Sequence, residues 1–382
     1  KKYKMKKVLF VSNVLSHIYA FHLPYIQWFK ENGFEVHVMA NSNGQQAKGF
    51  DKYYDVKIER SPFSLKNLAA YRAAKKIIDS EKYDVVHCHT PMGGVIGRLA
   101  SRTIRRRGAK VLYTAHGFHF YHGAPKINWL LYYTMEKFLA PYTDCIITIN
   151  GEDFNNAKEK FESPKTRVEK ISGIGVDINR FSPAEDKDAL KKAYGYEGKF
   201  LLTYAAEFIP RKNHRFFVEA AKELVKKCPE VKVLFAGKGV LLEETKKYAE
   251  ELGVAEYIDF LGFRSDMPDV LRMSDVLVSA SNQEGLAINI IEGFSVGLPV
   301  VASNVRGNKD AIVNGENGYV FDLNDTHDFC EKIERIYCDK ERYHKMSEQA
   351  KLTAEKFSIE NSLKQMEQIY KQYIGEGVAE SV

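Results

Sequence analysis

Hydrophobic residues along the chain fall into short runs that are separated by segments with helical spacing. Runs rich in Val, Ile, Leu and Phe occupy residues 6–14, 34–41, 83–90, 109–117 and 144–150. Between them, at 21–33 and 94–108, apolar residues recur at the three- and four-residue spacing of an amphipathic helix. Strands that alternate with helices in this way predict parallel β-α units and an α/β fold.

The same pattern starts again after a polar, glycine-rich stretch at residues 171–188. Further strands are expected at 199–208, 231–239, 258–263, 275–281 and 298–303. We therefore predict two Rossmann-like β/α/β domains, residues 1–180 and 181–360. Residues 361–382 are expected to add a C-terminal helix and a tail, with the helix packing back toward the N-terminal domain. In such sheets, ligands bind at the carboxyl ends of the strands.

The composition excludes several classes of protein. At 382 residues and 45% hydrophobic composition, the chain is long enough for two domains. The five cysteines form no C-x-x-C pair, so neither a disulfide framework nor a zinc knuckle is expected. No apolar run approaches the roughly 18–20 residues that span a bilayer, and the basic start "KKYKMKK" leads directly into a strand rather than a signal-peptide core. These features predict a cytoplasmic protein.

Charge is distributed unevenly along the chain. Lys and Arg outnumber Asp and Glu in residues 1–180, whereas acidic residues are in excess in residues 181–382. One basic cluster surrounds small and apolar residues at helical spacing and contains Arg98, Arg102, Arg105, Arg106 and Arg107. Two interpretations stand side by side, namely peripheral contact with an anionic membrane and ordinary solvated basic residues. No nucleic-acid partner is expected.

Aromatic residues are dense between residues 118 and 142. Most of them are expected in the core. The alternative is that some face a lipid-linked acceptor or a membrane interface, where amphipathic rings beside basic residues bind well.

Two carboxylates, Glu284 and Glu292, interrupt an otherwise small and apolar stretch at residues 281–303. Glu284 follows a strand and precedes Gly285, while the helix is expected to begin near Leu286 and to carry Glu292 a turn or two inside. A glycine at such a turn exposes N–H groups at the helix N-terminus, which bind phosphate. The two acids could then accept hydrogen bonds from sugar hydroxyls on either side of a diphosphate. Alternatively, Glu284 is an ordinary acid of the helix N-terminus and Glu292 is solvated.

The spacing of the two acids resembles the E-x7-E signature of retaining family 4 glycosyltransferases, and the match continues through "GLPVVAS". "GVDINRF", "VKVLFAGKG", "IDFLGF" and "DVLVSAS" extend the resemblance over most of the second half of the chain. The resemblance implies the GT-B fold, in which two Rossmann-like domains face each other across a cleft. It also implies that Glu284 contacts the donor sugar and Glu292 the nucleotide ribose, with the helix N-terminus at Gly285, Leu286 and Ala287 facing the diphosphate.

Two adjacent cations, Arg211 and Lys212, follow the strand at 199–208. By themselves such cations are usually solvated. The resemblance, however, places Lys212 at the phosphate-binding lysine of the family. Many members carry a partner arginine where this chain has Glu207, so Arg211 is the candidate that supplies the missing charge.

A histidine, His116, ends the strand at 109–117. A lone histidine at a strand end is more often structural than catalytic, but His116 resembles the active-site histidine of the family, which contacts the donor sugar. The nearby His119 and His122 lack the Asp, Glu or Cys that would complete a recognisable ligand set, so no metal is expected.

The loop after the first strand is the expected acceptor-binding segment. Many family members have a Gly-Gly pair there, and this chain has Ser16 and His17 instead. His17 and His22 are expected either to touch the acceptor or to pack locally.

The resemblance implies a retaining, metal-independent transfer of a sugar from a nucleotide-diphosphate donor, most simply a UDP-sugar, with no cofactor. The acceptor would be a glycan or polyprenyl-linked glycan of bacterial capsule or exopolysaccharide synthesis, at the inner face of the cell membrane. Backbone groups of Phe263 and Arg264 would hold the base. Two other functions stay open, a UDP-sugar epimerase of the same fold and a non-catalytic sugar-nucleotide-binding protein.

Two further motifs are discounted. "GGVIG" at residues 93–97 lacks the complete G-x-G-x-x-G fingerprint of a dinucleotide site. "EDKD" at residues 185–188 contains a D-x-D pair but lies in the charged hinge rather than at a strand end, so it predicts no metal site.

Overall fold

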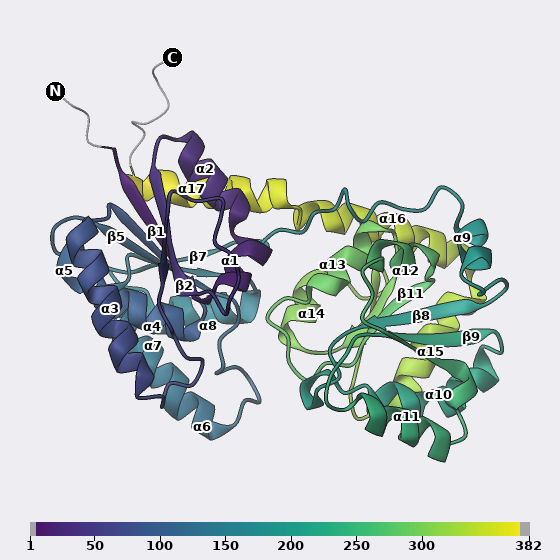
Figure 1. The fold of residues 1–382 in the computed structure, drawn as a ribbon. Coiled ribbons are helices and arrows are strands. Elements are labelled where there is room, and N and C mark those ends of the chain that lie inside the picture. The colour runs from purple at the N-terminus through teal and green to yellow at the C-terminus, as the bar shows by residue number, and fades with distance from the viewer. Residues whose placement is uncertain (1–4, 375–382) are drawn as a thin grey trace. The chain divides into compact units, whose positions relative to one another are not determined.

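The computed structural model describes residues 5–374 and divides the chain into two compact units (Figure 1). The first unit contains the residues up to Gly175 together with those from Ile359 onward, and the second unit is Val176–Ser358. Each unit is built on its own parallel sheet with flanking helices, so the α/β prediction is confirmed. The predicted tail after residue 374 and the first four residues of the basic start lie outside the described residues.

Within residues 5–374, the sheet of the first unit has seven strands, which are β1 (Lys7–Val14), β2 (Glu35–Asn41), β3 (Lys52–Asp55), β4 (Val85–His89), β5 (Lys110–Ala115), β6 (Cys145–Thr148) and β7 (Arg167–Lys170). All of them are parallel, in the order β3-β2-β1-β4-β5-β6-β7. Val8 of β1 lies opposite Val36 on one side and Val85 on the other. The strand order reverses at β1 and β4, so their carboxyl ends form the switch point at which such sheets bind ligands.

The helical segments of the first unit cover both faces of this sheet (Figure 1). They are α1 (Leu15–Phe21), α2 (Leu23–Glu31), α3 (Lys66–Glu81), α4 (Pro91–Ala100), α5 (Arg102–Arg105), α6 (Lys126–Asn128), the π-helical turn η1 (Trp129–Tyr133), α7 (Thr134–Leu139), the 3₁₀ turn η2 (Ala140–Tyr142), α8 (Gly151–Phe161) and α17 (Ile359–Ile374).

Close packing explains the glycines of α4. A Cβ atom on Gly94 would lie 2.5 Å from the ring of Tyr113, and one on Gly97 would lie 2.4 Å from Sγ of Cys88. The helix therefore needs small residues to approach β4 and β5. The glycines of "GGVIG" serve the packing of helix on sheet.

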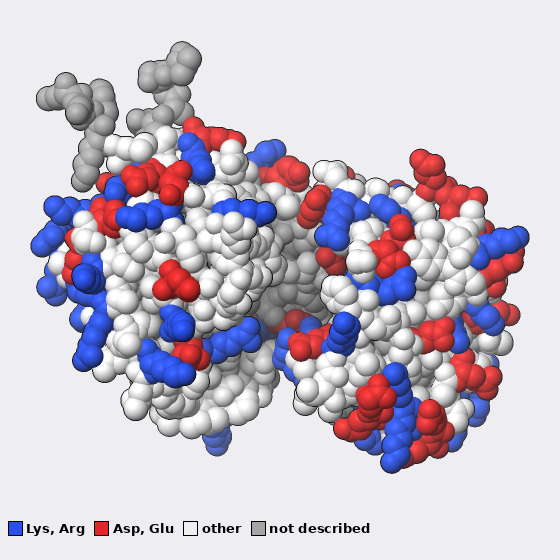
Figure 2. Space-filling model, in the orientation of Figure 1, with Lys and Arg blue, Asp and Glu red and all other residues white. Residues whose placement is uncertain are grey.

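One member of the predicted basic cluster is not on the surface. Arg98 is fully buried, and its guanidinium donates two hydrogen bonds, of 2.8 and 3.0 Å, to the carboxylate of Glu136. It also lies 3.9 Å from the ring centroid of Tyr113. The prediction was wrong for Arg98 because helical spacing turns this residue inward, where a buried partner compensates its charge. Arg102, Arg106 and Arg107 are exposed, and Figure 2 shows basic side chains gathered over α3 and α5.

The last helix, α17, belongs to the first unit although it ends the described chain. The Tyr370 ring stacks on Trp28 of α2 at 5.3 Å between centroids, and its hydroxyl lies 2.9 Å from Nδ1 of His87 in β4. Tyr370 is completely buried. The helix therefore completes the core beside β1 and β4.

The sheet of the second unit has, in the described part of the chain, six strands: β8 (Phe200–Ala205), β9 (Val231–Ala236), β10 (Ile258–Gly262), β11 (Val276–Ser279), β12 (Val300–Ser303) and β13 (Gly318–Phe321). All are parallel, in the order β10-β9-β8-β11-β12-β13. This order repeats that of the first six strands of the first unit. Its switch point therefore lies at the carboxyl ends of β8 and β11.

Helices also flank the second sheet, and aromatic side chains fill the interior between them. The segments are α9 (Lys187–Ala193), η3 (Pro210–Lys212), α10 (Arg215–Lys227), α11 (Leu242–Glu251), η4 (Ala255–Tyr257), α12 (Met267–Met273), α13 (Ile288–Ser295), α14 (Arg306–Ala311), α15 (Thr326–Cys338) and α16 (Lys340–Lys356). Phe216, Phe321 and Phe329 pack against one another with centroids 4.8–5.6 Å apart. These contacts pack α10 and α15 against β13.

Candidate active site

The loop after β8 carries the two predicted cations of the second unit. Arg211 and Lys212 lie in the short 3₁₀ turn η3, where the backbone oxygen of Lys212 accepts a 2.7 Å hydrogen bond from the hydroxyl of Tyr204. Tyr204 is buried in β8. The turn is therefore anchored to the sheet, and Lys212 is held at the end of the strand.

The loop after β11 brings Glu284 to these cations. Lys212 Nζ donates a 2.5 Å hydrogen bond to Oε1 of Glu284, and Nη1 of Arg211 lies 3.5 Å from Oε2. The Glu284 side chain is 9% exposed, against 45% for Arg211. Glu284 is thus a nearly buried, ion-paired carboxylate and not an ordinary acid of a helix N-terminus.

The following helix begins later than the sequence indicates. Ala287 has extended backbone angles, and α13 starts at Ile288 rather than near Leu286. Residues 285–287 therefore lie before the helix and not inside it. Glu292 lies one turn inside the helix and is half-buried, and burial raises the pKa of its carboxyl group above the ordinary value.

Two residues outside the predicted site, Gly307 and Asn289, support the Glu284 loop and the start of α13. Neither was predicted from the sequence. A Cβ atom on Gly307 would lie 2.5 Å from the carbonyl oxygen of Gly285, so only glycine permits this approach. The amide of Asn289 donates a 3.1 Å hydrogen bond to the carbonyl oxygen of Ala205, which ties α13 to the end of β8. The glycine after β12 in "SNVRGNK" was the available signal for Gly307.

A cavity of about 470 Å³ opens at the carboxyl ends of β8, β9 and β10 in the second unit. Its lining includes Glu207, Gly237, Phe263 and Arg264. Phe263 is 71% exposed, and the guanidinium of Arg264 is held by the carboxylate of Asp266. A flat, open aromatic surface beside backbone groups is suited to an aromatic base, and Glu207 lies at its edge.

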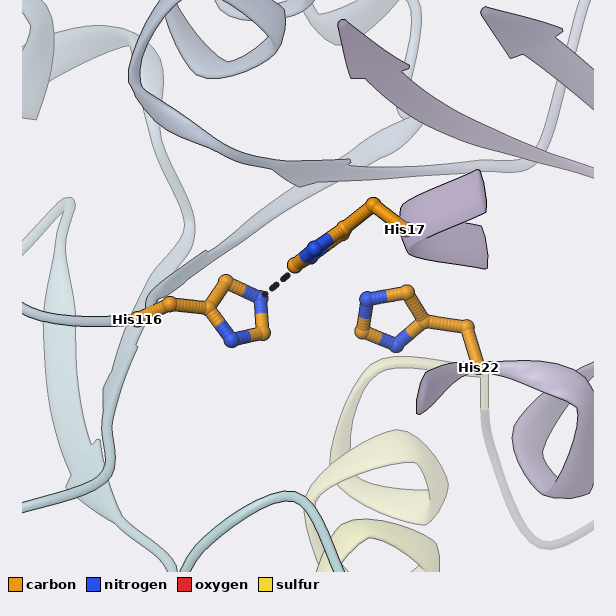
Figure 3. A group of neighbouring side chains, drawn as sticks. All are labelled: His17, His22 and His116. Atoms are coloured by element: carbon orange, nitrogen blue, oxygen red, sulfur yellow. Dashed lines mark hydrogen bonds between the residues drawn. The ribbon is translucent and has the colours of Figure 1, made fainter. Parts of the chain in front are cut away.

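Histidines meet at the switch point of the first unit. His17 of α1 and His116, which directly follows β5, approach to 3.3 Å between their Nε2 atoms. His22, between α1 and α2, points toward them (Figure 3). His22 also stacks on His89 at the end of β4, with centroids 3.7 Å apart. His89 was missed as a member of this group, although "HCHT" at the end of a buried strand was a usable signal.

Burial keeps these rings neutral near pH 7. It lowers the pKa of His17 to about 4 and moves those of His22 and His116 further in the same direction. His22 is fully buried, whereas Ser16, beside His17, is exposed. The predicted acceptor-binding residues therefore differ in solvent exposure. The histidine cluster presents neutral nitrogen atoms rather than positive charge.

The other two histidines of the segment after β5 lie apart from this group. The His119 ring packs on Tyr132 at 4.5 Å, and the backbone N–H of His122 donates to the carboxylate of Glu152. His116 groups with His17 and His22 instead.

Comparison with protein families matches both units of the chain. Residues 186–353 match the family "Glycosyl transferases group 1", and residues 7–150 match "Glycosyl transferase 4-like". The chain is 44% identical over 373 residues to the protein EpsD of Bacillus subtilis (strain 168), which is named as a glycosyltransferase, and the alignment covers 97% of each chain.

The chain belongs to the group 1 (family 4) glycosyltransferases. A second relative of this glycosyltransferase is the Escherichia coli UDP-Gal:alpha-D-GlcNAc-diphosphoundecaprenol alpha-1,3-galactosyltransferase, 34% identical over 72% of each chain. Among solved structures, Anabaena HepE in complex with UDP and glucose aligns with a TM-score of 0.76 at 18% identity, over 96% of this chain and 100% of that one. The predicted GT-B fold is confirmed for the glycosyltransferase.

No helix that the structure describes between residues 5 and 374 combines the length and the apolar character needed to cross a bilayer.

Proposed function

We propose that this glycosyltransferase moves a sugar from a UDP-sugar to a lipid-linked glycan, with retention of anomeric configuration, in the synthesis of a cell-surface polysaccharide. The observation that carries the proposal is the contact of Lys212 with Glu284 at the carboxyl ends of β8 and β11. A cation and a carboxylate at this switch point can bind a phosphate and a sugar hydroxyl side by side.

The donor would lie along the loops of the second unit. Lys212 and Arg211 would neutralise the charge that grows on the departing diphosphate, together with the N–H groups of residues 285–287. Glu284 would accept hydrogen bonds from the donor sugar and Glu292 from the ribose. The cavity beside Phe263 and Arg264 would hold the base.

The reaction needs no enzyme nucleophile in this scheme. The bond between the anomeric carbon and the diphosphate oxygen breaks, the acceptor oxygen bonds to the same face of that carbon, and the acceptor proton passes to a phosphate oxygen. The cations of the chain carry out the role at the diphosphate that a metal ion has in other transferases. His116 would contact the donor sugar, while Ser16, His17 and His22 would form the acceptor side.

The acceptor proposal rests on the E. coli relative, whose name specifies a diphosphoundecaprenol-linked sugar. The first unit adds a surface suited to such a substrate. Ile127, Leu130 and Phe138 are 55–66% exposed along α6, η1 and α7, and Lys126 and Lys137 on the same segment are exposed. Apolar and basic residues together favour the surface of an anionic membrane. The glycosyltransferase would therefore act at the inner face of the cell membrane.

Membrane contact is testable on its own. Sedimentation with anionic phosphatidylglycerol vesicles should recover the protein, and neutral phosphatidylcholine vesicles should recover much less. Leu130→Glu should weaken sedimentation, whereas Val240→Glu, at an even more exposed apolar residue of the second unit, should not. Equal recovery of the Leu130→Glu protein would contradict this part of the proposal.

The central experiment is ligand-observed NMR with a panel of UDP- and GDP-sugars, followed for several hours without acceptor. We expect selective binding of one UDP-sugar and at most slow hydrolysis. Glu292→Ala should abolish the binding, whereas Glu348→Ala, at an exposed residue of α16, should leave it intact. Appearance of an epimer would identify an isomerase instead. Binding with no transfer to any lipid-linked acceptor would favour a binding protein.

A further inference from the structure

The histidine cluster of the first unit has the composition of a metal-ligand set. His17, His22 and His116 each offer a ring nitrogen, and these three atoms lie within 4.8 Å of one another (Figure 3). The residues come from the segments that follow β1 and β5, on either side of β4 in the sheet. Two separate segments of the chain thus bring three nitrogen atoms close together.

The closest distance in the cluster matches metal coordination. Zinc binds imidazole nitrogen at about 2.0–2.1 Å in tetrahedral geometry, which places neighbouring ligand atoms about 3.3–3.4 Å apart. Nε2 of His17 and Nε2 of His116 are 3.3 Å apart. In the structure a hydrogen bond joins these two atoms, and an ion bound between them would replace its proton at nearly the same separation. The ring nitrogen of His22 lies within 4.8 Å of both and would move closer to form a third bond.

His22 supplies an independent observation. It is fully buried, and in the described structure neither of its ring nitrogens has a hydrogen-bond partner. Buried polar atoms normally have partners, because desolvation without compensation is unfavourable. The ring points toward His17 and His116 (Figure 3), so an ion at the centre of the cluster would satisfy one of its nitrogens.

The kind of ligand atom supports the same conclusion. The ligand set is purely nitrogen. Such a set suits zinc and similar transition metals, whereas magnesium and calcium prefer oxygen ligands.

We propose that His17, His22 and His116 form a binding site for one divalent transition-metal ion of the zinc type. His17 also lines a cavity of about 300 Å³ together with Asn13 and Thr90, so water can reach this ring of the cluster. All three ligand residues belong to the first unit. If Nε2 of His116 binds the ion, the proposed contact of His116 with the donor sugar is made by Nδ1.

The test uses the full chain without a histidine tag. After dialysis against trace zinc, elemental analysis should find one zinc ion per chain. Titration of the zinc-free protein with cobalt(II) should give the intense visible bands of tetrahedral coordination, which zinc then removes. His17→Ala and His116→Ala should lower the zinc affinity at least about tenfold, whereas His122→Ala, at an exposed histidine of the same unit, should keep it.

Circular dichroism melting checks that each variant folds, and the cobalt spectrum of the unmodified protein decides the matter if one does not. Zinc-free protein after dialysis, together with an octahedral or absent cobalt spectrum, would overturn the proposal. Retention of full zinc affinity by folded His17→Ala protein would overturn it as well. Neither readout depends on sugar transfer, so failure of the proposed function would leave this result interpretable.

Discussion

Lys212 and Glu284 are 72 positions apart in the sequence, yet their side chains meet at 2.5 Å in the second unit. Each lies in the loop that follows a central strand, and each is mostly buried, with 16% and 9% of the side chain exposed. In this arrangement the carboxylate orients the lysine ammonium before any substrate arrives. A donor phosphate would then share the lysine with Glu284.

Removing the lysine tests this relationship directly. Lys212→Ala should lower kcat for sugar transfer by about 10²- to 10³-fold, the effect typical of losing one group that stabilises developing negative charge. Thermal unfolding should show that the fold survives. Lys247→Ala, at an exposed residue of α11, is the matched control and should transfer at the unmodified rate. A folded Lys212→Ala protein with normal activity would refute the phosphate assignment.

The raised pKa of Glu292 gives a pH-dependent prediction. The ionised carboxylate accepts hydrogen bonds from ribose hydroxyls, so UDP affinity should fall as the pH is lowered through the raised pKa. Calorimetric titration between pH 7.5 and pH 5 should show this loss. In Glu292→Gln no carboxyl group titrates at this position. Its UDP affinity should be weaker and should not show this dependence on pH. Parallel pH profiles for the two proteins would mean that Glu292 does not contact the nucleotide.

The buried ion pair in the first unit predicts a large effect on stability. Glu136→Gln leaves the guanidinium of Arg98 without its compensating charge, which should destabilise the fold by about 3–5 kcal/mol. Chemical denaturation followed by circular dichroism measures the change. The exposed Glu341→Gln in α16 should leave the melting temperature unchanged. Little change for Glu136→Gln would show that Tyr113 and the carbonyl of Gly94 suffice for Arg98.

A glycine beside the proposed base cavity makes the fourth prediction. A Cβ atom on Gly237 would lie 1.9 Å from the carbonyl oxygen of Ala206, so two loops lining the cavity must separate in Gly237→Ala. The variant should lose UDP affinity as well as about 1–3 kcal/mol of stability. Gly195→Ala strains a left-handed backbone in open space and should reduce stability with UDP affinity unchanged. Unchanged UDP affinity in Gly237→Ala would place the base elsewhere.

The sequence pattern predicted much of this architecture because strand and helix periods are local. Parallel β-α units place strand ends on one edge of a sheet, so Lys212 and Glu284 could both be assigned to that edge before the structure was known. Their direct pairing could not, since it depends on the turn at η3 and on the loop that Gly307 supports from behind.

The missed features arise from contacts between distant segments. Arg98 was assigned to the surface because nothing in the sequence links it to Glu136, 38 positions away. The grouping of His22 with His89 and His116 depends in the same way on three strand ends converging. Helix α13 starts at Ile288 because the backbone of Ala287 is extended, and no capping residue in the sequence marks this start.

The return of α17 to the first unit also bears on how the protein is made. Tyr370 fills the interior beside Trp28 and His87. The core of the first unit is therefore incompletely packed until α17 has left the ribosome. All the residues of the second unit are translated before that moment. The first unit is begun first and completed last, and a nascent chain that stops before Ile359 leaves the ring of Trp28 and the imidazole of His87 without this cover.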